Sequence, residues 1–200
     1  MNRLVCGIGF NDGKYLSKVN GKAPREYVAW GHMLLRCTEK YWEKKPTYTG
    51  TTCSNNFKNY SYFYEWCHRQ VGFGNKDEKG NVWHLDKDIL IKSSKVYDES
   101  VCIFIPARIN SLLTKRDYAR GDFPIGVSWH EKSKKFHARC CYGVGGKTKH
   151  IGYFNTQQEA FQAYKTFKEA LIKDVANEYR AQLDTRAYQA LMKYEVNIND

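Results

Sequence analysis

One short segment carries residue types that could transfer protons and bind a hard cation. The residues from Trp83 to Ile91, WHLDKDILI, are predicted to form a β-strand. Side chains alternate between the two faces of a strand, so His84, Asp86 and Asp88 are expected to share one face. An imidazole can serve as a general base, and carboxylate oxygens are ligands that Mg²⁺ prefers. The alternative interpretation is a satisfied histidine beside Trp83 and a solvated strand face.

The elements that must position this segment follow it directly. A polar loop over residues 92–100 leads to a second short strand, predicted from Val101 to Ile105. Pro106 then suits the first turn of a helix that continues to Leu113, because the N–H that proline lacks would be unpaired there in any case. The predicted order is therefore strand, loop, strand and helix.

A second stretch, Phe123 to Tyr164, is predicted to form three antiparallel strands and a helix. The strands are expected over residues 125–129, 135–142 and 149–154, with a glycine-rich turn at 142–146. Thr156 and Glu159 have the spacing of a capping box, which marks a helix start. Apolar residues then recur at helical spacing, so one helix face can lie across the sheet. The recurring apolar residues are Ala160, Tyr164, Phe167 and Leu171.

Positive charge is concentrated on this sheet. Residues 126–152 contain six Lys or Arg and one acid, Glu131, a balance of +5, and the whole chain has a net charge of +11. Basic residues on a short ribbon beside Trp129 are typical of a phosphate-binding surface, and such a charge favours nucleic acid as partner over a membrane surface. The alternative is a solvated basic hairpin without a partner.

The remaining sequence predicts further helices and an α+β fold. Helices are expected over residues 24–44 and 55–70, after residue 156 to about Tyr179, and in a last segment that packs back on the core. No apolar run approaches the roughly 20 residues of a membrane span. The N-terminus has no secretory pattern, so a cytoplasmic location is expected.

The seven cysteines have no Cys-x-x-Cys pair, which favours reduced and mostly buried thiols. A zinc site drawing on Cys37, Cys53, Cys67 and His68 remains an alternative, but structural zinc is not expected.

The sheet stretch resembles the APETALA-type DNA-binding domain of plant ethylene-response factors. The similar residues are Gly126-Val127, Phe136-His-Ala138, Ile151-Gly-Tyr-Phe154, Thr156, Glu159-Ala160 and Ala163-Tyr164. The resemblance implies a sheet that lies in the major groove of double-stranded DNA. Positions that match DNA contacts are Ser128, His130, Arg139 or Cys141, and His150, where the plant proteins mostly carry Arg and Trp. We therefore expect phosphate contacts here rather than base reading. The predicted DNA-binding set is Ser128, Trp129, His130, Lys134, Lys135, Arg139, Lys147, Lys149 and His150.

The upstream residues resemble the degenerate HNH segment of small homing endonucleases from tailed phages, in which an APETALA-type domain commonly follows the nuclease segment. The similar blocks are LDKDIL, KVYDESVCIFIP and INSLL, with the pattern Tyr27-x-x-Trp30-x-x-Met33-x-x-Arg36-Cys37 before them. The resemblance implies a ββα-metal nuclease unit over residues 1–118, including a helical N-terminal part. The APETALA-type domain with a helical extension would occupy residues 119–200.

The resemblance also implies roles for individual residues. Its Asp-His pair falls on Asp86-Lys87, so Lys87 occupies the general-base position and His84, two residues earlier, is the candidate base. Asp86 or Asp88 together with Asn110 would hold Mg²⁺ or Mn²⁺, which binds the phosphate and stabilises the leaving oxygen.

Two functions follow as expectations. The first is a metal-dependent HNH homing endonuclease that cleaves double-stranded DNA, acting in the host cytoplasm if the chain is phage-encoded. The alternative is a catalytically inactive DNA-binding protein, or a protein that interacts with a host protein, built on a nuclease-like framework. A small-molecule enzyme is a distant third, because no cofactor loop or triad spacing is present.

Overall fold

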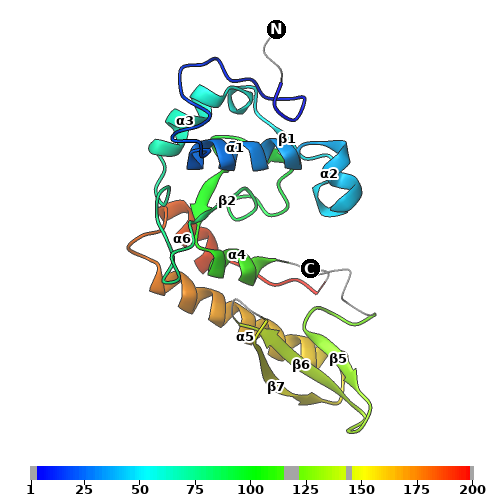
Figure 1. Ribbon diagram of the computed structural model, residues 1–200. Coiled ribbons are helices and arrows are strands. Elements are labelled where there is room, and N and C mark those ends of the chain that lie inside the picture. The colour runs from blue at the N-terminus through cyan, green and yellow to red at the C-terminus, as the bar shows by residue number, and fades with distance from the viewer. Residues whose placement is uncertain (1–3, 115–121, 143–145, 199–200) are drawn as a thin grey trace. The chain divides into compact units, whose positions relative to one another are not determined.

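The computed structural model describes residues 4–114, 122–142 and 146–198. Within these residues the fold is mixed α+β with six α-helices and a three-stranded antiparallel sheet, which confirms the predicted class at this level (Figure 1). The chain divides into two compact units. The first contains Met1–Lys76 and Val82–Ile105, and the second contains Asp77–Asn81 and Pro106–Asp200.

The helix predicted over residues 24–44 of the first unit is two helices, α1 (Arg25–Arg36) and α2 (Glu39–Lys44). Thr38 lies between them in an extended conformation, and its hydroxyl accepts a hydrogen bond from the Tyr41 amide at 3.3 Å. A threonine that satisfies a free amide in this way starts a new helix instead of continuing the previous one. The prediction of one continuous helix was wrong at this point.

The helix predicted over residues 55–70 is shorter than expected. A 3₁₀ turn, η2 (Asn56–Lys58), precedes α3 (Tyr60–His68). The Asn59 side chain caps α3 by accepting hydrogen bonds from the amides of Ser61 and Tyr62. The aromatic residues of this region were predicted to pack, and they form the core of the first unit. Its fully buried side chains include Trp30, Met33, Leu34, Phe57, Tyr60, Phe63 and Phe104.

Short strands complete the first unit. After the 3₁₀ turn η1 (Pro46–Tyr48), β1 (Thr52–Cys53) pairs in parallel with β3 (Val96–Tyr97). The strand β2 (His84–Asp86) pairs antiparallel with β4 (Ile103–Ile105), whose three residues are buried. The strand predicted over residues 83–91 was therefore too long, since its regular part ends at Asp86.

The second unit is built on the predicted meander. It begins with α4 (Ala107–Leu113), for which Pro106 is the N-cap, and continues through β5 (Val127–His130), β6 (Lys135–Cys141) and β7 (Thr148–Phe154). The strand order is β5-β6-β7 and both pairings are antiparallel. Most of the predicted turn at 142–146 lies outside the described residues.

One face of this sheet is covered by α5 (Gln157–Glu178), which is followed by α6 (Thr185–Met192). The predicted capping box is present: the Thr156 hydroxyl accepts from the Glu159 amide at 3.2 Å, and the Glu159 carboxylate accepts from the Thr156 amide at 3.1 Å. Core residues on both sides of the interface include Val127, Ala138, Cys140, Ala160, Phe161 and Tyr164.

The C-terminal segment packs back on this core, as predicted. Val196 is buried in the same cluster. Its carbonyl accepts from the Lys165 ammonium at 2.8 Å, and its amide donates to the Glu169 carboxylate at 2.9 Å. This segment therefore belongs to the fold of the second unit.

Candidate functional site

The register of the three-stranded sheet separates its residues into two faces. Val127 pairs with Ala138, and both are buried beneath α5. Because side chains alternate along a strand, every second residue from Val127 along β5 and from Ala138 back along β6 shares that face, which we call the covered face. The intervening residues form the opposite face, which we call the open face. Its members are Ser128, His130, Lys135, His137, Arg139, Cys141, Thr148, His150 and Tyr153.

A tyrosine lies at the centre of the histidines on the open face. Tyr153 is 42% exposed, and the centroid of its ring is 4.8 Å from that of His130 and 4.9 Å from those of His137 and His150. The Nε2 atom of His137 and the Nδ1 atom of His150 are 2.7 Å apart, which is hydrogen-bonding distance. The open face therefore carries an aromatic cluster with titratable edges.

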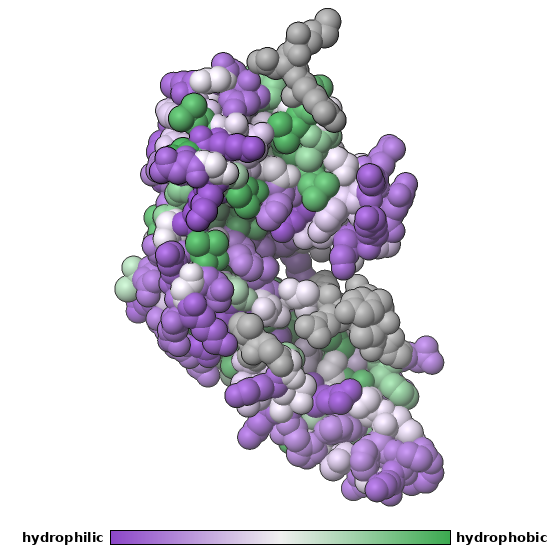
Figure 2. Space-filling model, viewed as in Figure 1, coloured by the Kyte–Doolittle hydropathy of each residue, from purple (hydrophilic) through white to green (hydrophobic). Residues whose placement is uncertain are grey.

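The charge on the open face has one sign. Lys135 and Arg139 are exposed, and no residue of β5, β6 or β7, all of which the structure describes, is Asp or Glu. Hydrophilic residues also dominate the region of these strands in the view of Figure 2. A sheet face with cations, imidazoles and an exposed ring has the chemistry needed to contact phosphates and bases.

Five of the predicted DNA-binding residues are brought together on this face. They are Ser128, His130, Lys135, Arg139 and His150. His137 and Tyr153 are on the face as well, although the predicted set omits them. The alternation along Lys135–Cys141 could have identified His137, because it lies two residues from both Lys135 and Arg139.

Trp129 differs from the expectation. It pairs with Phe136 on the α5 side of the sheet, and the two rings are 5.0 Å apart in an edge-to-face arrangement. Its indole N–H donates to Glu131 at 2.7 Å. The residue that was predicted to sit beside the basic ribbon therefore belongs to the face opposite His130.

Three predicted lysines also lie off the open face. Lys134 follows the turn after β5 and pairs with Glu131, which offsets its charge. Lys149 pairs in register with Cys140, a buried residue of the covered face. Lys147 is exposed just before β7 begins. The positive charge of the open face thus comes from Lys135 and Arg139.

The second candidate site is the segment around β2 in the first unit. His84 pairs with Ile105 and Asp86 with Ile103, so His84 and Asp86 share a strand face as predicted. His84 is exposed and Asp86 is partly buried. Burial raises the pKa of Asp86, although hydrogen bonds from the amides of Ile89 and Asp88 act in the opposite direction.

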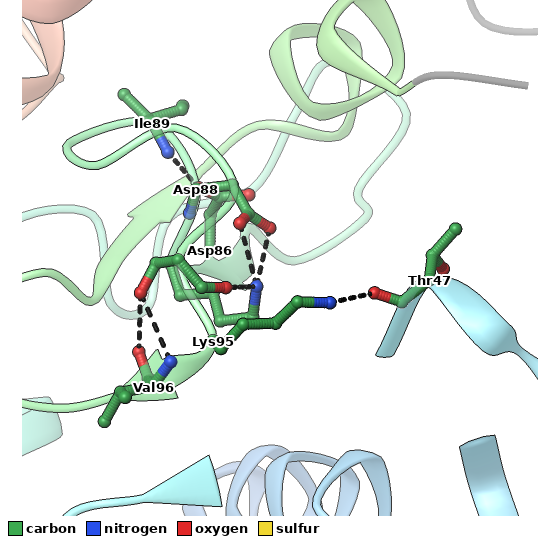
Figure 3. Close-up of polar contacts among 8 residues, drawn as sticks. Thr47, Asp86, Asp88, Ile89, Lys95 and Val96 are labelled. Carbon is green, nitrogen blue, oxygen red and sulfur yellow. Dashed lines mark hydrogen bonds and ion pairs between the residues drawn. The ribbon is translucent and has the colours of Figure 1, made fainter. Parts of the chain in front are cut away.

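The chain turns immediately after Asp86 (Figure 3). The Oδ1 atom of Asp86 accepts hydrogen bonds from the amides of Asp88 at 2.8 Å and Ile89 at 2.9 Å. An aspartate that bonds to amides two and three residues ahead holds a turn and ends the strand. Asp88 is consequently beyond the strand, and the prediction that it alternates with His84 and Asp86 was wrong.

Lys87 occupies the position that the HNH resemblance assigns to the general base. Lys87 is 6% exposed. Its ammonium contacts both carboxylate oxygens of Asp88, at 2.8 and 3.0 Å, and the carbonyl of Ser94. The same ammonium is 5.6 Å from the centre of the Tyr97 ring. These contacts join the two ends of the loop after β2.

This arrangement does not fit a divalent cation at Asp86 and Asp88. Both oxygens of Asp88 already contact an ammonium, and Oδ1 of Asp86 is bonded to two amides. Among the described residues no group of three or more His, Cys, Asp and Glu side chains is placed to hold a metal. Asn110, the third predicted ligand, is on α4 and belongs to the second unit.

The cysteines named for the alternative zinc site are not one cluster. The thiols of Cys37 and Cys53 are hydrogen-bonded to each other, and this bond together with burial raises the pKa of Cys37. Cys67 is buried in α3, where burial is the main cause of its raised pKa. His68 contacts Glu26 instead of a thiol.

The contact between His68 and Glu26 was not anticipated from the sequence. The Nε2 atom of His68 is 2.8 Å from Oε1 of Glu26, whose residue is 8% exposed. The two residues come from α3 and α1, and no local sequence pattern pairs them. A buried carboxylate orients the imidazole and joins the two helices.

Comparisons with known proteins identify no relative of this chain: no protein-family model, no curated protein and no solved structure matches it. Within the described residues, no helix combines the length and the apolar character that crossing a bilayer requires.

Proposed function

We propose that this protein binds double-stranded DNA through the open face of the β5-β6-β7 sheet. The observation that carries the proposal is the segregation of the two faces. The apolar residues of the sheet lie beneath α5, whereas the open face presents Lys135, Arg139, three histidines and Tyr153 without an acid. This is the surface that the APETALA-type resemblance implies.

The contacts suit the DNA backbone better than individual bases. Arg139 is the one arginine of the open face and can form two parallel hydrogen bonds with phosphate or guanine. Compared with Arg139, the contacts of Lys135 are less directional, and the imidazole side chains are shorter. We therefore expect binding that depends on salt and discriminates weakly between sequences.

Salt dependence tests the proposal. The double variant Arg139→Ala/Lys135→Ala should reduce the slope of log Kd against log salt by about two, because each lost phosphate contact removes roughly 0.9 of a released counterion. Fluorescence anisotropy with a short labelled duplex measures this slope at several salt concentrations. A charge-matched control is Arg180→Ala/Lys193→Ala, which removes two cations from the segments after α5 and α6.

An equal loss of slope in the two double variants would show that general charge, not the open face, contacts DNA. Duplex RNA and single-stranded DNA of the same length serve as competitors. If either competitor displaces the labelled duplex preferentially, that nucleic acid will replace double-stranded DNA as the proposed partner.

A second candidate function is metal-dependent cleavage of the same DNA by an HNH-type ββα segment. It is favoured by the antiparallel pairing of β2 with β4 and by the direct passage from β4 through Pro106 into α4. The salt bridge between Lys87 and Asp88 opposes this candidate, because it occupies a carboxylate that the reaction would need for its metal. Binding is for this reason the first proposal.

The two functions are separated by incubating the protein with supercoiled plasmid in Mg²⁺, in Mn²⁺ and in EDTA. If the chain cleaves, nicked or linear DNA will form only with metal and will be lost in His84→Ala. Retarded but intact plasmid under all three conditions is the outcome expected of a binding protein. Equal cleavage by His84→Ala and the parent protein would assign the base to another residue.

A further inference from the structure

On the open face, His137 and His150 contact each other directly through their ring nitrogens. Nε2 of His137 and Nδ1 of His150 are 2.7 Å apart, so one nitrogen must carry a hydrogen and the other a lone pair. One proton therefore lies between the rings. The two outer nitrogens, Nδ1 of His137 and Nε2 of His150, then share a single further hydrogen when the pair is neutral.

The pair can accept only one more proton while this contact persists. Adding one proton gives both outer nitrogens an N–H and leaves the bond between the rings in place. A second proton would put two N–H groups opposite each other at hydrogen-bonding distance, and the contact would break. The intact pair is thus a neutral group or a monocation with two outward donors.

The third histidine makes a different contact. Nδ1 of His130 accepts a hydrogen bond from the backbone amide of Ser133 at 3.3 Å and is 2.9 Å from the Ser133 hydroxyl. A proton on Nδ1 would abolish the bond from the amide. The Nδ1 lone pair of His130 is therefore used within its own turn, whereas His137 and His150 are joined to each other.

The surroundings of His137 disfavour a positive charge on this ring when no anion is bound. Arg139 pairs with His150 in the sheet, His130 is beside His137, and Lys135 is across from His130. Burial lowers the pKa of His137, and His150, Arg139 and His130 lower it further. No acid of the three strands offsets these charges, and Tyr153 contributes a neutral ring. A bound phosphate would supply the missing negative charge.

We propose that the His137–His150 pair and Arg139 form a subsite for one phosphate group of the DNA backbone, and that the subsite takes up one proton when that phosphate binds. The inference rests on the proposed function. Beyond that function, it assigns the groups that hold the phosphate and the number of protons that accompany binding.

The sign of the pH dependence follows from the two states. In the free protein the surroundings of His137 disfavour its protonation, whereas a bound phosphate favours the protonated pair. The affinity therefore rises as the pH falls through the pKa of the phosphate-bound pair. The gain in affinity is complete below the pKa of the free pair. Between these values one linked proton changes Kd by at most tenfold per pH unit.

The experiment measures Kd for a short duplex at fixed salt concentration between about pH 5.5 and 8, the range over which histidine titrates. The parent protein should show a slope of log Kd against pH that approaches one. Calorimetry at one pH in two buffers with different ionisation enthalpies provides an independent count of protons taken up.

Matched variants assign the proton. The double variant His137→Gln/His150→Gln should reduce the slope to near zero, because glutamine keeps a polar side chain without titrating. Either single variant leaves one imidazole that can still take up a proton. His130→Gln should retain the slope. His32→Gln, an exposed substitution in α1 of the other unit, is the control for loss of any histidine. Circular dichroism of each variant checks that the fold is retained.

The possible failures are distinguishable. Absence of DNA binding at every pH would overturn the proposed function itself. Binding that is strong but independent of pH would overturn only the subsite. A slope that approaches two, or one that survives in the double variant His137→Gln/His150→Gln, would contradict the one-proton pair and place the titration on His130 or elsewhere.

Discussion

At the scale of single residues, Lys87 shows how a position with an implied catalytic role can have a structural one. Its ammonium is buried and joins Asp88 to the Ser94 carbonyl across the loop that follows β2. A buried cation that is bonded in this way cannot readily lose a partner, because an unpaired charge away from water is costly. The side chain therefore has a clear contribution to stability.

Replacing Lys87 with methionine tests this contribution. The variant keeps most of the buried chain but leaves the Ser94 carbonyl without its donor, and we expect a loss of about 2 kcal/mol in the free energy of unfolding. Urea denaturation measures the loss. Lys18→Met, an exposed substitution in the same unit, should cost almost nothing. Equal stability of the two variants would show that the Lys87 contacts are not maintained in solution.

At the scale of elements, the packing of α5 on the sheet depends on a close approach at Gly126. This residue has a φ of +80°, and a Cβ atom there would lie 2.1 Å from the Tyr164 ring. Left-handed backbone and lack of space each exclude a side chain, for separate reasons. Gly146 has a similar φ of +79° with nothing within 4 Å of a Cβ.

These two glycines separate backbone strain from packing. Gly146→Ala should lose only the cost of the left-handed conformation, about 1 kcal/mol. Gly126→Ala should lose that amount and about 2 kcal/mol more, because Tyr164 must move within a packed core. Thermal unfolding of both variants measures the difference. Equal losses would mean that α5 can shift away from the sheet at little cost.

At the scale of the whole molecule, the two units have separate hydrophobic cores. The first is built around Trp30, Phe57 and Phe63, and the second around Ala138, Ala160 and Tyr164. Chains with independent cores often unfold in more than one step. We expect calorimetry to show two transitions for the intact protein.

The same substitutions identify the transitions. Lys87→Met should lower the midpoint of the transition that belongs to the first unit, and Gly126→Ala should lower the other. Each variant should leave the remaining midpoint almost unchanged. A single transition that shifts in both variants would show that the units unfold together.

Local patterns were sufficient to predict the main elements of the second unit. Alternation and glycine placement located β5, β6 and β7, and the Thr156–Glu159 spacing located the start of α5. These features depend on neighbouring residues in the chain, which is why they can be recognised without the structure. The concentration of positive charge on the sheet was likewise visible in the composition.

The polar contacts of the candidate sites were decided by tertiary structure. Alternation placed Asp88 on the strand, but the turn held by Asp86 moved it toward Lys87. The pairing of His137 with His150 depends on the register of β6 and β7, including an irregularity after Ala138. A shift of one residue would put either ring on the opposite face. The sequence therefore determined the elements of the second unit and their charge, whereas the register and the loop geometry determined which groups meet, because those contacts join residues that are distant along the chain.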